Sequence, residues 1–335
     1  MSNLEIGLDT FGDRTLGPDG TLQSHAQVIR NVVEQAELAD RLGLAFFGVG
    51  ERHRDDFTVS APEVALAAIA TRTTQIHLGS AVTVLSSDDP IRVFQRFSTL
   101  DAISNGRAEV ILGRGSFTES FPLFGLDLKQ YDALFESKCE MFAAARRGDK
   151  IRGRVVYPPV EHGLLRTWIG VGGTPESVVR AAHYGFHLML AIIGGEPMRF
   201  TPFVELYRKA CAEFSQPADL PIGCHSPGHV AETDELAREQ LWPHFLAQRT
   251  KIGGERGWPP PSRAQFDREA GPTGALFVGS PETVAQKIAA TAKVLSLSRF
   301  DLKYSNGAMP HDQMCKSIEL IGTRVVPRVH ELLAR

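Results

Sequence analysis

Residues 75–115, QIHLGSAVTVLSSDDPIRVFQRFSTLDAISNGRAEVILGRG, decide the predicted fold of this 335-residue chain. The first part, residues 76–85, is apolar and rich in β-branched residues, which is typical of a strand buried on both faces. Residues 108–112 predict a second buried strand, with a helix between the two. Strands joined in this way lie parallel through a right-handed crossover, so both end at the same edge of a sheet. We expect chemistry at that edge, where residues 86–87 and 113–115 come together.

The helix between these strands carries both a start and a stop signal. Asp88 or Asp89 can cap it, because a side-chain oxygen accepts from the free N–H groups of the first turn. Pro90 suits the first helical position, where a missing N–H costs least. Asn105-Gly106 provides a left-handed end. The apolar face has helical spacing and consists of Val93, Phe94, Phe97, Leu100 and Ile103.

The rest of the chain repeats the alternation of strand and helix. Strands are predicted over residues 5–10, 44–49, 76–85, 108–112, 167–171, 187–193, 222–226 and 300–304, and a helix follows each, the last over 311–320. Ser60 and Glu63 have the spacing of a capping box and open the second predicted helix. Eight β/α units favour one closed barrel with inserted loops, covering residues 1–335, because an open sheet leaves two edges to protect. Residues 253–274 are predicted to be irregular.

Composition places the chain among ordinary globular proteins. The net charge is −3 and the basic residues are spread along the chain, so we expect no nucleic acid and no anionic membrane as a partner. No apolar run approaches membrane-spanning length, and the opening MSNLEIGLDTFG lacks the features of a signal peptide. The four cysteines lie far apart and form no CxxC pair, which favours reduced thiols in a cytoplasmic protein.

The turn at residues 172–177, GGTPES, follows a predicted strand, opens a helix and indicates a phosphate site. Glycines let the backbone approach a ligand, hydroxyls can bond to it, and a helix start presents free N–H groups. The candidate residues are Gly172, Gly173, Thr174 and Ser177. Arg114, flanked by glycines at another strand end, could supply a guanidinium fork. The alternatives are an ordinary Thr-Pro helix cap and a surface arginine.

Three ionisable residues, Glu51, Arg52 and His53, directly follow the second predicted strand. A histidine titrates near neutral pH and can serve as acid, base or hydrogen-bond donor, so His53 is a catalytic candidate. The alternative is a structural pair between Glu51 and Arg52, with His53 as a satisfied partner.

His225 and His229 have the i, i+4 spacing of helical metal ligands, but Pro227 and Gly228 between them argue against a helix. A metal-dependent barrel hydrolase would carry His-x-His after an early strand, and LDTFG has none. Walker, GxSxG and GxGxxG motifs are also absent. We therefore predict no metal site and keep His225 as a further candidate that donates a proton or orients substrate.

The sequence resembles the bacterial luciferase-like, flavin-dependent monooxygenases. The resemblance is strongest over residues 76–115, quoted above, and continues in WIGVGGTPESVVRAAHYGF, VGSPETVAQKI and IELIGTRVVPRV. It extends over nearly the whole chain and is weakest between residues 194 and 274. The family implies an eight-stranded β/α barrel, commonly a homodimer, that uses reduced FMN, or sometimes a deazaflavin, and often dioxygen.

The resemblance also implies roles for individual residues. The positions that match those holding the flavin phosphate are Arg114, Gly173, Thr174 and Ser177. Ala81-Val82 matches a place where family members have a non-proline cis peptide beneath the flavin ring. Luciferases carry Glu-His-His after the second strand, with the first His catalytic, and here Arg52 stands at that position. Gly113 replaces their reactive cysteine, so we do not predict light emission.

The expected function is a monooxygenase that uses reduced FMN and dioxygen on a small organic substrate, with His53, Arg52 and His225 as catalytic candidates. Because FMN would be a shuttled substrate, an NAD(P)H-dependent flavin reductase would be the functional partner. Residues 253–274 are predicted to close over the site as a lid. The alternatives are a deazaflavin-dependent hydride-transfer oxidoreductase, a flavin-binding protein without turnover and, last, a metal-dependent barrel hydrolase.

Overall fold

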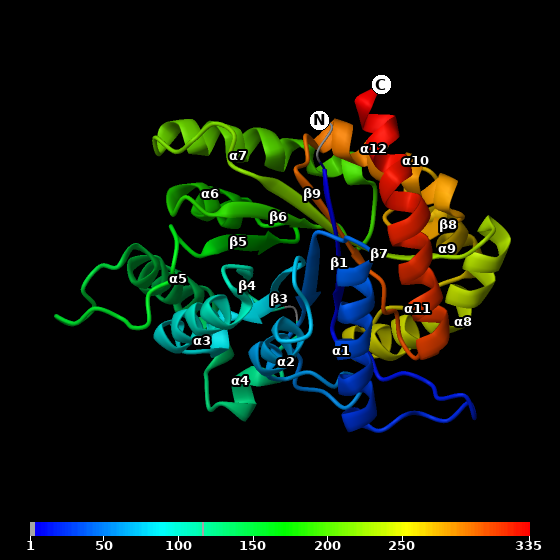
Figure 1. Ribbon diagram of the computed structural model, residues 1–335, viewed down its shortest axis with the longest axis horizontal. Helices are drawn as coiled ribbons and strands as arrows, with labels where there is room; N and C mark the ends of the chain where they lie inside the picture. Colours follow the sequence, from blue (N-terminus) through cyan, green and yellow to red (C-terminus); the bar gives the residue numbers. More distant parts are fainter. Residues whose placement is uncertain (1–3, 116) are drawn as a thin grey trace.

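The computed structural model describes residues 4–115 and 117–335, and its centre is a closed barrel of parallel strands (Figure 1). Around the barrel the strands follow the order β1 (Glu5–Thr10), β2 (Phe46–Val49), β3 (His77–Val84), β4 (Ala108–Gly113), β5 (Arg166–Val171), β6 (His187–Ala191), β7 (Ile222–Val230) and β9 (Arg299–Lys303). β9 pairs with β1, so the ring closes and leaves no open edge. The predicted eight-stranded β/α barrel and all of its predicted strands are confirmed.

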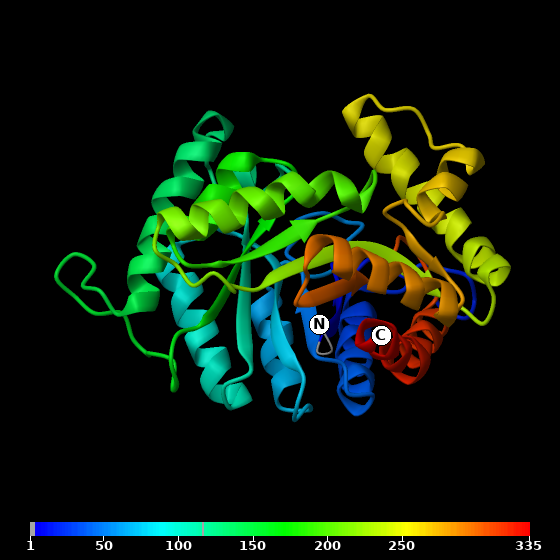
Figure 2. The same cartoon turned by 90° about the horizontal axis from the view of Figure 1, so that it is seen from above.

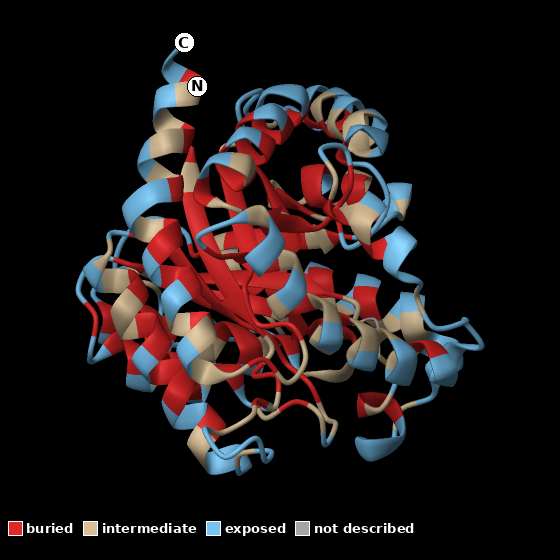
Figure 3. Cartoon of the chain, turned by 90° about the vertical axis from the view of Figure 1, so that its right-hand side faces the viewer, coloured by how far each residue is buried: buried red, intermediate tan, exposed pale blue. Residues whose placement is uncertain are grey.

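Helices surround the strands, and Figure 2 shows the same arrangement from above. They are α1 (His25–Arg41), α2 (Pro62–Ala70), α3 (Pro90–Ser104), α4 (Ser120–Leu123), α5 (Tyr131–Arg147), α6 (Pro175–His183), α7 (Thr201–Glu213), α8 (Asp234–Arg256), α9 (Arg263–Ala270), α10 (Pro281–Leu295), α11 (His311–Leu320) and α12 (Val326–Ala334). In Figure 3 the strands are mostly buried, whereas the helices expose their outer faces. Within the described part of the chain, no helix is both long and apolar enough to span a membrane.

Apolar side chains fill two spaces, one outside the barrel wall and one inside it. In β4, Val110 and Leu112 join the large cluster between strands and helices, whereas Ile111 joins the interior. This division follows from the alternation of side chains along a strand. The interior cluster consists of Phe46, Ala81, Ile111, Trp168 and Met189, with Val82 packed against it.

The β3–α3–β4 unit has the signals that the sequence predicts. The Asp89 carboxylate caps α3, accepting from the backbone N–H groups of Ile91 and Arg92, each at 2.9 Å. Pro90 occupies the first helical position, and Asn105 ends the helix in the left-handed conformation, with φ of 59°. Local capping signals and buried strands therefore suffice to predict this unit without reference to the rest of the barrel.

The predicted capping box of α2 is wrong. The residue before this helix is Ala61, no side chain caps the helix, and Pro62 sets its start. The Glu63 carboxylate instead pairs with Arg96 of α3, with 3.2 Å between Oε1 and Nε. The spacing of a capping box was present in sequence, but Pro62 shifted the helix start past Ser60.

The predicted irregular span at residues 253–274 is largely helical. It contains the last turn of α8 and the whole of α9, followed by a short strand, β8 (Phe277–Gly279), that the sequence did not reveal. β8 pairs with the outer end of β7, which runs four residues beyond its predicted end. Gly253, where the predicted irregular span begins, lies inside α8, and a Cβ there would approach the Trp258 carbonyl oxygen to 3.3 Å.

The C-terminal helix also continues past its predicted end. A π-helical turn, Ile321–Val325, follows α11 and leads directly into α12. Gly322 follows the predicted helix end, and a Cβ there would lie 2.6 Å from that of Leu42. Glycine at this position therefore allows close packing against the end of α1 and does not end the helix.

Lys287 of α10 ties down the segment between α9 and β8. Its Nζ donates to the carbonyl oxygens of Gly271 and Leu276, each at 2.6 Å, and lies 4.9 Å from the centre of the Phe277 ring. Burial lowers the pKa of Lys287 to about 7.

This lowered pKa predicts a pH-dependent contribution to stability. Between pH 7 and the ordinary lysine pKa of 10.5, the unfolded chain binds a proton at Lys287 that the folded chain does not. The free energy of unfolding of the wild type should therefore rise with pH across this window relative to that of Lys287→Met. Urea unfolding of both proteins at pH 6, 8 and 10 measures the difference. A constant difference would show that Lys287 has the same pKa in both states.

Candidate active site

Arg114 and the turn that opens α6 meet at the carboxyl ends of β4 and β5. Arg114 Nη2 donates to Thr174 Oγ1 at 2.5 Å, and Nη1 pairs with Asp132 Oδ1 at 2.7 Å. The Asp132 side chain is 80% exposed, so this ion pair adds little stability and a ligand can replace it. The structure therefore brings together the residues of the predicted phosphate site.

The turn itself leaves room and donors for an anion. No heavy atom lies within 4 Å of where a Cβ on Gly172 or Gly173 would stand, and Gly173 has φ of 150°. Thr174 precedes the first turn of α6 without capping it through its side chain. Open space, free N–H groups at the start of a helix and a guanidinium suit a phosphate group.

A second guanidinium, Arg180, lies one turn further along α6 and was not predicted. Arg180 Nη1 donates to the hydroxyl of Ser177 at 3.2 Å, and Nε pairs with Glu136 Oε2 at 2.5 Å. Ser177 is buried, so Arg180 fixes the orientation of its hydroxyl. The i, i+3 spacing of Ser177 and Arg180 on one helix was the available signal.

Glu51 anchors His53 and the end of β3. Its Oε1 lies 2.9 Å from His53 Nε2, and its Oε2 accepts from the backbone N–H of Val84 at 2.8 Å. Arg52 does not pair with this carboxylate, because its Nη1 donates to the Glu51 backbone carbonyl at 2.7 Å. The predicted alternative of a Glu51–Arg52 pair is therefore wrong, and His53 is the partner.

The peptide bond between Ala81 and Val82 is cis, as the family resemblance implies. The side chain of Val82 packs against the interior cluster of the barrel. It also lies against Gly113, where a Cβ would stand 2.4 Å from a Val82 methyl carbon. The Val82 carbonyl accepts from the N–H of Glu51 at 3.3 Å. Glu51 therefore holds the backbone on both sides of Thr83.

His225 pairs with the buried carboxylate of Asp9 across the barrel, with 2.6 Å between Nδ1 and Oδ2. His225 lies within β7, inside the part of that strand that the sequence predicted, and His229 lies in its unpredicted extension. Phe11 stacks on the His225 ring with 6.2 Å between centres. His229 is buried elsewhere and bonds to Gln240 at 2.8 Å. The two histidines therefore do not share a site, and no acidic, histidine or cysteine cluster in the described residues could hold a metal.

A hollow of about 400 Å³ opens beside the loop that follows β2. It is lined by His25, Arg52, His53, Arg54, Asp55, Phe57, Thr58, Ser60 and Leu123. Arg52 and His53, two of the three predicted catalytic candidates, thus line the same hollow. His225 and the turn at residues 172–177 do not line it.

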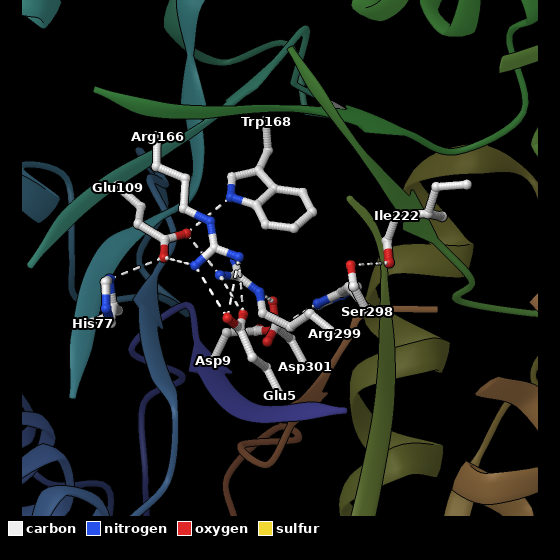
Figure 4. A network of polar contacts seen from close by, with 11 residues as sticks. Glu5, Asp9, His77, Glu109, Arg166, Trp168, Ile222, Ser298, Arg299 and Asp301 are labelled. Carbon is white, nitrogen blue, oxygen red and sulfur yellow. Dashed lines mark hydrogen bonds and ion pairs between the residues drawn. The ribbon is translucent and has the colours of Figure 1, made fainter. Parts of the chain in front are cut away.

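The end of the barrel interior where the strands begin, away from the candidate site, holds a network of charged residues (Figure 4). Glu109 pairs with Arg299 at 2.6 Å and with Arg166 at 2.9 Å, and it accepts from the Trp168 indole at 2.8 Å. Arg299 also pairs with Asp301 at 3.1 Å. Burial raises the pKa of Asp301 to about 7, and the nearby carboxylate of Asp9 adds to the shift despite the attraction of Arg299.

The lid prediction concerns residues near this hollow. Arg54 Nη2 pairs with Glu255 of α8 at 2.6 Å, and Lys251 Nζ lies 3.2 Å from Asp55 Oδ1. The end of α8 is therefore attached to the loop that carries His53. A lid movement of residues 253–274 would break the contact between Arg54 and Glu255, and it remains a prediction.

A family profile for luciferase-like monooxygenases matches residues 12–296. The chain therefore belongs to the luciferase-like monooxygenase family, and it is an oxidoreductase of that family.

Curated relatives include the N-acetyl-S-alkylcysteine monooxygenase of Bacillus subtilis, 28% identical over 247 residues, which are 71% of each chain. The limonene 1,2-monooxygenase of Rhodococcus erythropolis is 37% identical over 226 residues, 64% of this chain and 58% of that one.

Solved structures share the fold. The monooxygenase RslO1 of Streptomyces bottropensis has a TM-score of 0.84 at 22% identity, covering 97% of this chain and 99% of its own. The oxygenating constituent of 3,6-diketocamphane monooxygenase from Pseudomonas putida, in complex with FMN, has a TM-score of 0.77 at 16% identity, covering 98% and 99%. An F420-dependent secondary alcohol dehydrogenase in complex with an F420-acetone adduct has a TM-score of 0.75 at 16% identity, with the same coverage.

Proposed function

We propose that this protein is a monooxygenase that uses reduced FMN and dioxygen to oxidise a small organic substrate. The observation that carries the proposal is the contact between Arg114 and Thr174 beside the open turn at Gly172 and Gly173. Such a cradle suits the phosphate that distinguishes FMN from riboflavin. The monooxygenases among the curated relatives support the use of dioxygen.

In this function, Arg114, Gly173, Thr174 and Ser177 hold the phosphate, and Ala81-Val82 lies beneath the flavin ring. Reduced FMN would supply the electrons with which dioxygen oxidises the substrate. The chain's own contribution is a barrel mouth that excludes water and holds protons at defined atoms.

Two histidines are positioned for proton transfer. The Asp9 carboxylate accepts from Nδ1 of His225, which leaves Nε2 to exchange a proton with a ligand. The Glu51 carboxylate contacts Nε2 of His53, which leaves Nδ1 of that ring to exchange a proton with a ligand. Each ring is therefore oriented by a buried carboxylate, as acid–base histidines require.

The proposed enzyme receives its reduced flavin from a separate NAD(P)H-dependent flavin reductase and acts as a homodimer. Because FMN would be exchanged at every cycle, binding through a phosphate cradle at the barrel mouth suits release as well as capture.

Anaerobic titration with reduced FMN, in parallel with reduced F420, tests the proposed function. We expect absorbance changes that saturate at one reduced FMN per chain, and slower reoxidation of the bound flavin than of free FMN on mixing with aerated buffer. Binding of F420 alone would replace the proposal with a deazaflavin-dependent hydride transfer. FMN binding with immediate reoxidation would indicate a flavin-binding protein without oxygenase chemistry.

A further inference from the structure

Arg52 is a buried cation that forms no direct ion pair within the described residues, and the carboxylates of Asp13, Glu51, Glu119 and Asp9 favour its charge only from a distance. Arg52 is 9% exposed, and within the described part of the chain its side chain donates one hydrogen bond, from Nη1 to the Glu51 carbonyl. Nε is buried and makes no hydrogen bond, and the guanidinium forms no ion pair with a carboxylate in residues 4–115 or 117–335. Burial lowers the pKa of Arg52 to about 10. A buried charge without a close counter-ion is costly and calls for an explanation.

The neighbouring arginine on the same loop shows the contrast. Arg54 pairs with Asp56 at 2.9 Å, with Glu119 at 2.5 Å and with Glu255 at 2.6 Å. Its charge is fully engaged in holding the loop to α8. Arg52 instead lies among aromatic rings, 4.1 Å from the centre of Phe11, 5.1 Å from Phe117 and 5.8 Å from Phe57.

Arg52 also faces a space that can hold a ligand. It lines the hollow of about 400 Å³, a volume within the range of small-molecule sites. Phe57 and Leu123 give that hollow apolar walls, and the carboxylate of Asp55 on its wall is taken by Lys251. A guanidinium in a hollow of mixed lining, with Phe57 and Leu123 as its apolar parts, is suited to a carboxylate carried on a small apolar body.

Resting on the function proposed above, we infer that the substrate is a small organic carboxylate whose anionic group pairs with Arg52. Phe11, Phe57 and Phe117 hold the guanidinium in place without neutralising it. The apolar part of the substrate lies along the hollow beside His53. Arg52 thereby replaces the catalytic histidine of luciferases with a residue that selects substrate charge.

The test compares hexanoate with hexanamide, which differ in charge and hardly in shape. Ligand-observed NMR titrations of flavin-free and FMN-loaded protein give both dissociation constants. We expect the wild type to bind hexanoate at least about tenfold more tightly, as a charged hydrogen bond implies. Arg52→Met should abolish the preference, and Arg52→Lys should retain part of it.

The matched control is Arg146→Met. Arg146 is a half-buried arginine whose pKa burial also lowers to about 10; it bonds to the Leu165 carbonyl at 2.8 Å and lies 5.3 Å from the Phe186 ring, but it does not line the hollow. This variant should keep the full preference for hexanoate.

Equal binding of hexanoate and hexanamide by the wild type would overturn the inference, and so would a preference that survives Arg52→Met. The wild-type comparison needs no variant, so misfolding of Arg52→Met cannot obscure the result. Failure of the proposed function is separate, because it would appear as absent or non-saturable binding of reduced FMN. A carboxylate preference measured on flavin-free protein does not depend on that outcome.

Discussion

Glu109→Gln should lower the free energy of unfolding by about 3–5 kcal/mol, the cost of leaving a buried charge without its partner. Glu109 is fully buried and accepts from Arg299, Arg166 and the Trp168 indole, so its two oxygens meet donors only (Figure 4). Glutamine would direct an N–H₂ group at one of these donors and leave the fully buried Arg299 with less compensation. Urea unfolding at pH 7 measures the change.

Glu5→Gln is the control for this prediction. Glu5 pairs with Arg166 at 3.0 Å in the same network, but its side chain is 36% exposed, so its loss should cost less than about 1 kcal/mol. Adding Arg299→Met to Glu109→Gln should restore part of the stability, because it removes the uncompensated buried cation while leaving Asp301 without its partner. A loss below about 1 kcal/mol for Glu109→Gln alone would contradict the role given to this pair.

The ion pair between Glu109 and Arg299 also predicts how the free energy of unfolding depends on pH. Burial by itself would raise the pKa of Glu109, but Arg299, a hydrogen bond to His77 and Arg166 together hold it well below its ordinary value of 4.5. A carboxylate with a lowered pKa contributes stability above its unfolded pKa and loses that contribution as the pH falls. The difference in stability between the wild type and Glu109→Gln should therefore shrink as the pH falls below 4.5.

The sequence predicted the barrel because parallel strands buried on both faces appear as short apolar runs. It did not predict the charged interior. In β9, Arg299, Asp301 and Lys303 alternate with Phe300 and Leu302, a pattern that normally indicates a strand with one solvated face. All five residues are buried, because the polar face of β9 lies inside the closed barrel. Only barrel closure, which local sequence does not encode, distinguishes an interior polar face from a solvated one.

The candidate site likewise has one part that the sequence predicted and one part that it did not. Arg114 directly follows β4, Thr174 follows β5 after two glycines, and β4 and β5 are neighbours, so the order of strands and turns sufficed to predict both residues for one phosphate site. Asp9 and His225 are 216 positions apart on β1 and β7, which are both neighbours of β9. Their pairing depends on the register around the closed barrel and had no signal in the sequence. Arg52 has no ion pair with Glu51, because the Glu51 carboxylate contacts His53 and the backbone N–H of Val84. Nothing in the sequence signalled that choice of partners.

Arg114→Ala should weaken the binding of reduced FMN about a hundredfold and leave the binding of riboflavin nearly unchanged. A charge-assisted hydrogen bond contributes about 1.5–3 kcal/mol, and each 1.4 kcal/mol is a factor of about ten in affinity. Riboflavin lacks the phosphate, so it reports any effect of the substitution on the ring site. Arg147→Ala is the control, because Arg147 has a similar ion pair, with Asp149 at 2.8 Å, on the exposed surface. Anaerobic absorbance titrations give all the dissociation constants.

Asp132→Ala separates a phosphate role of Arg114 from a structural one. In the present structure Arg114 divides its donors between Thr174 and Asp132. If Arg114 serves the phosphate, removing the exposed Asp132 carboxylate frees a donor and removes a repelling charge, so FMN should bind as tightly as before or more tightly. If Arg114 merely fastens α5 to the barrel, Asp132→Ala and Arg114→Ala break the same contact and should weaken FMN and riboflavin alike. Opposite effects of the two substitutions on FMN would assign Arg114 to the ligand.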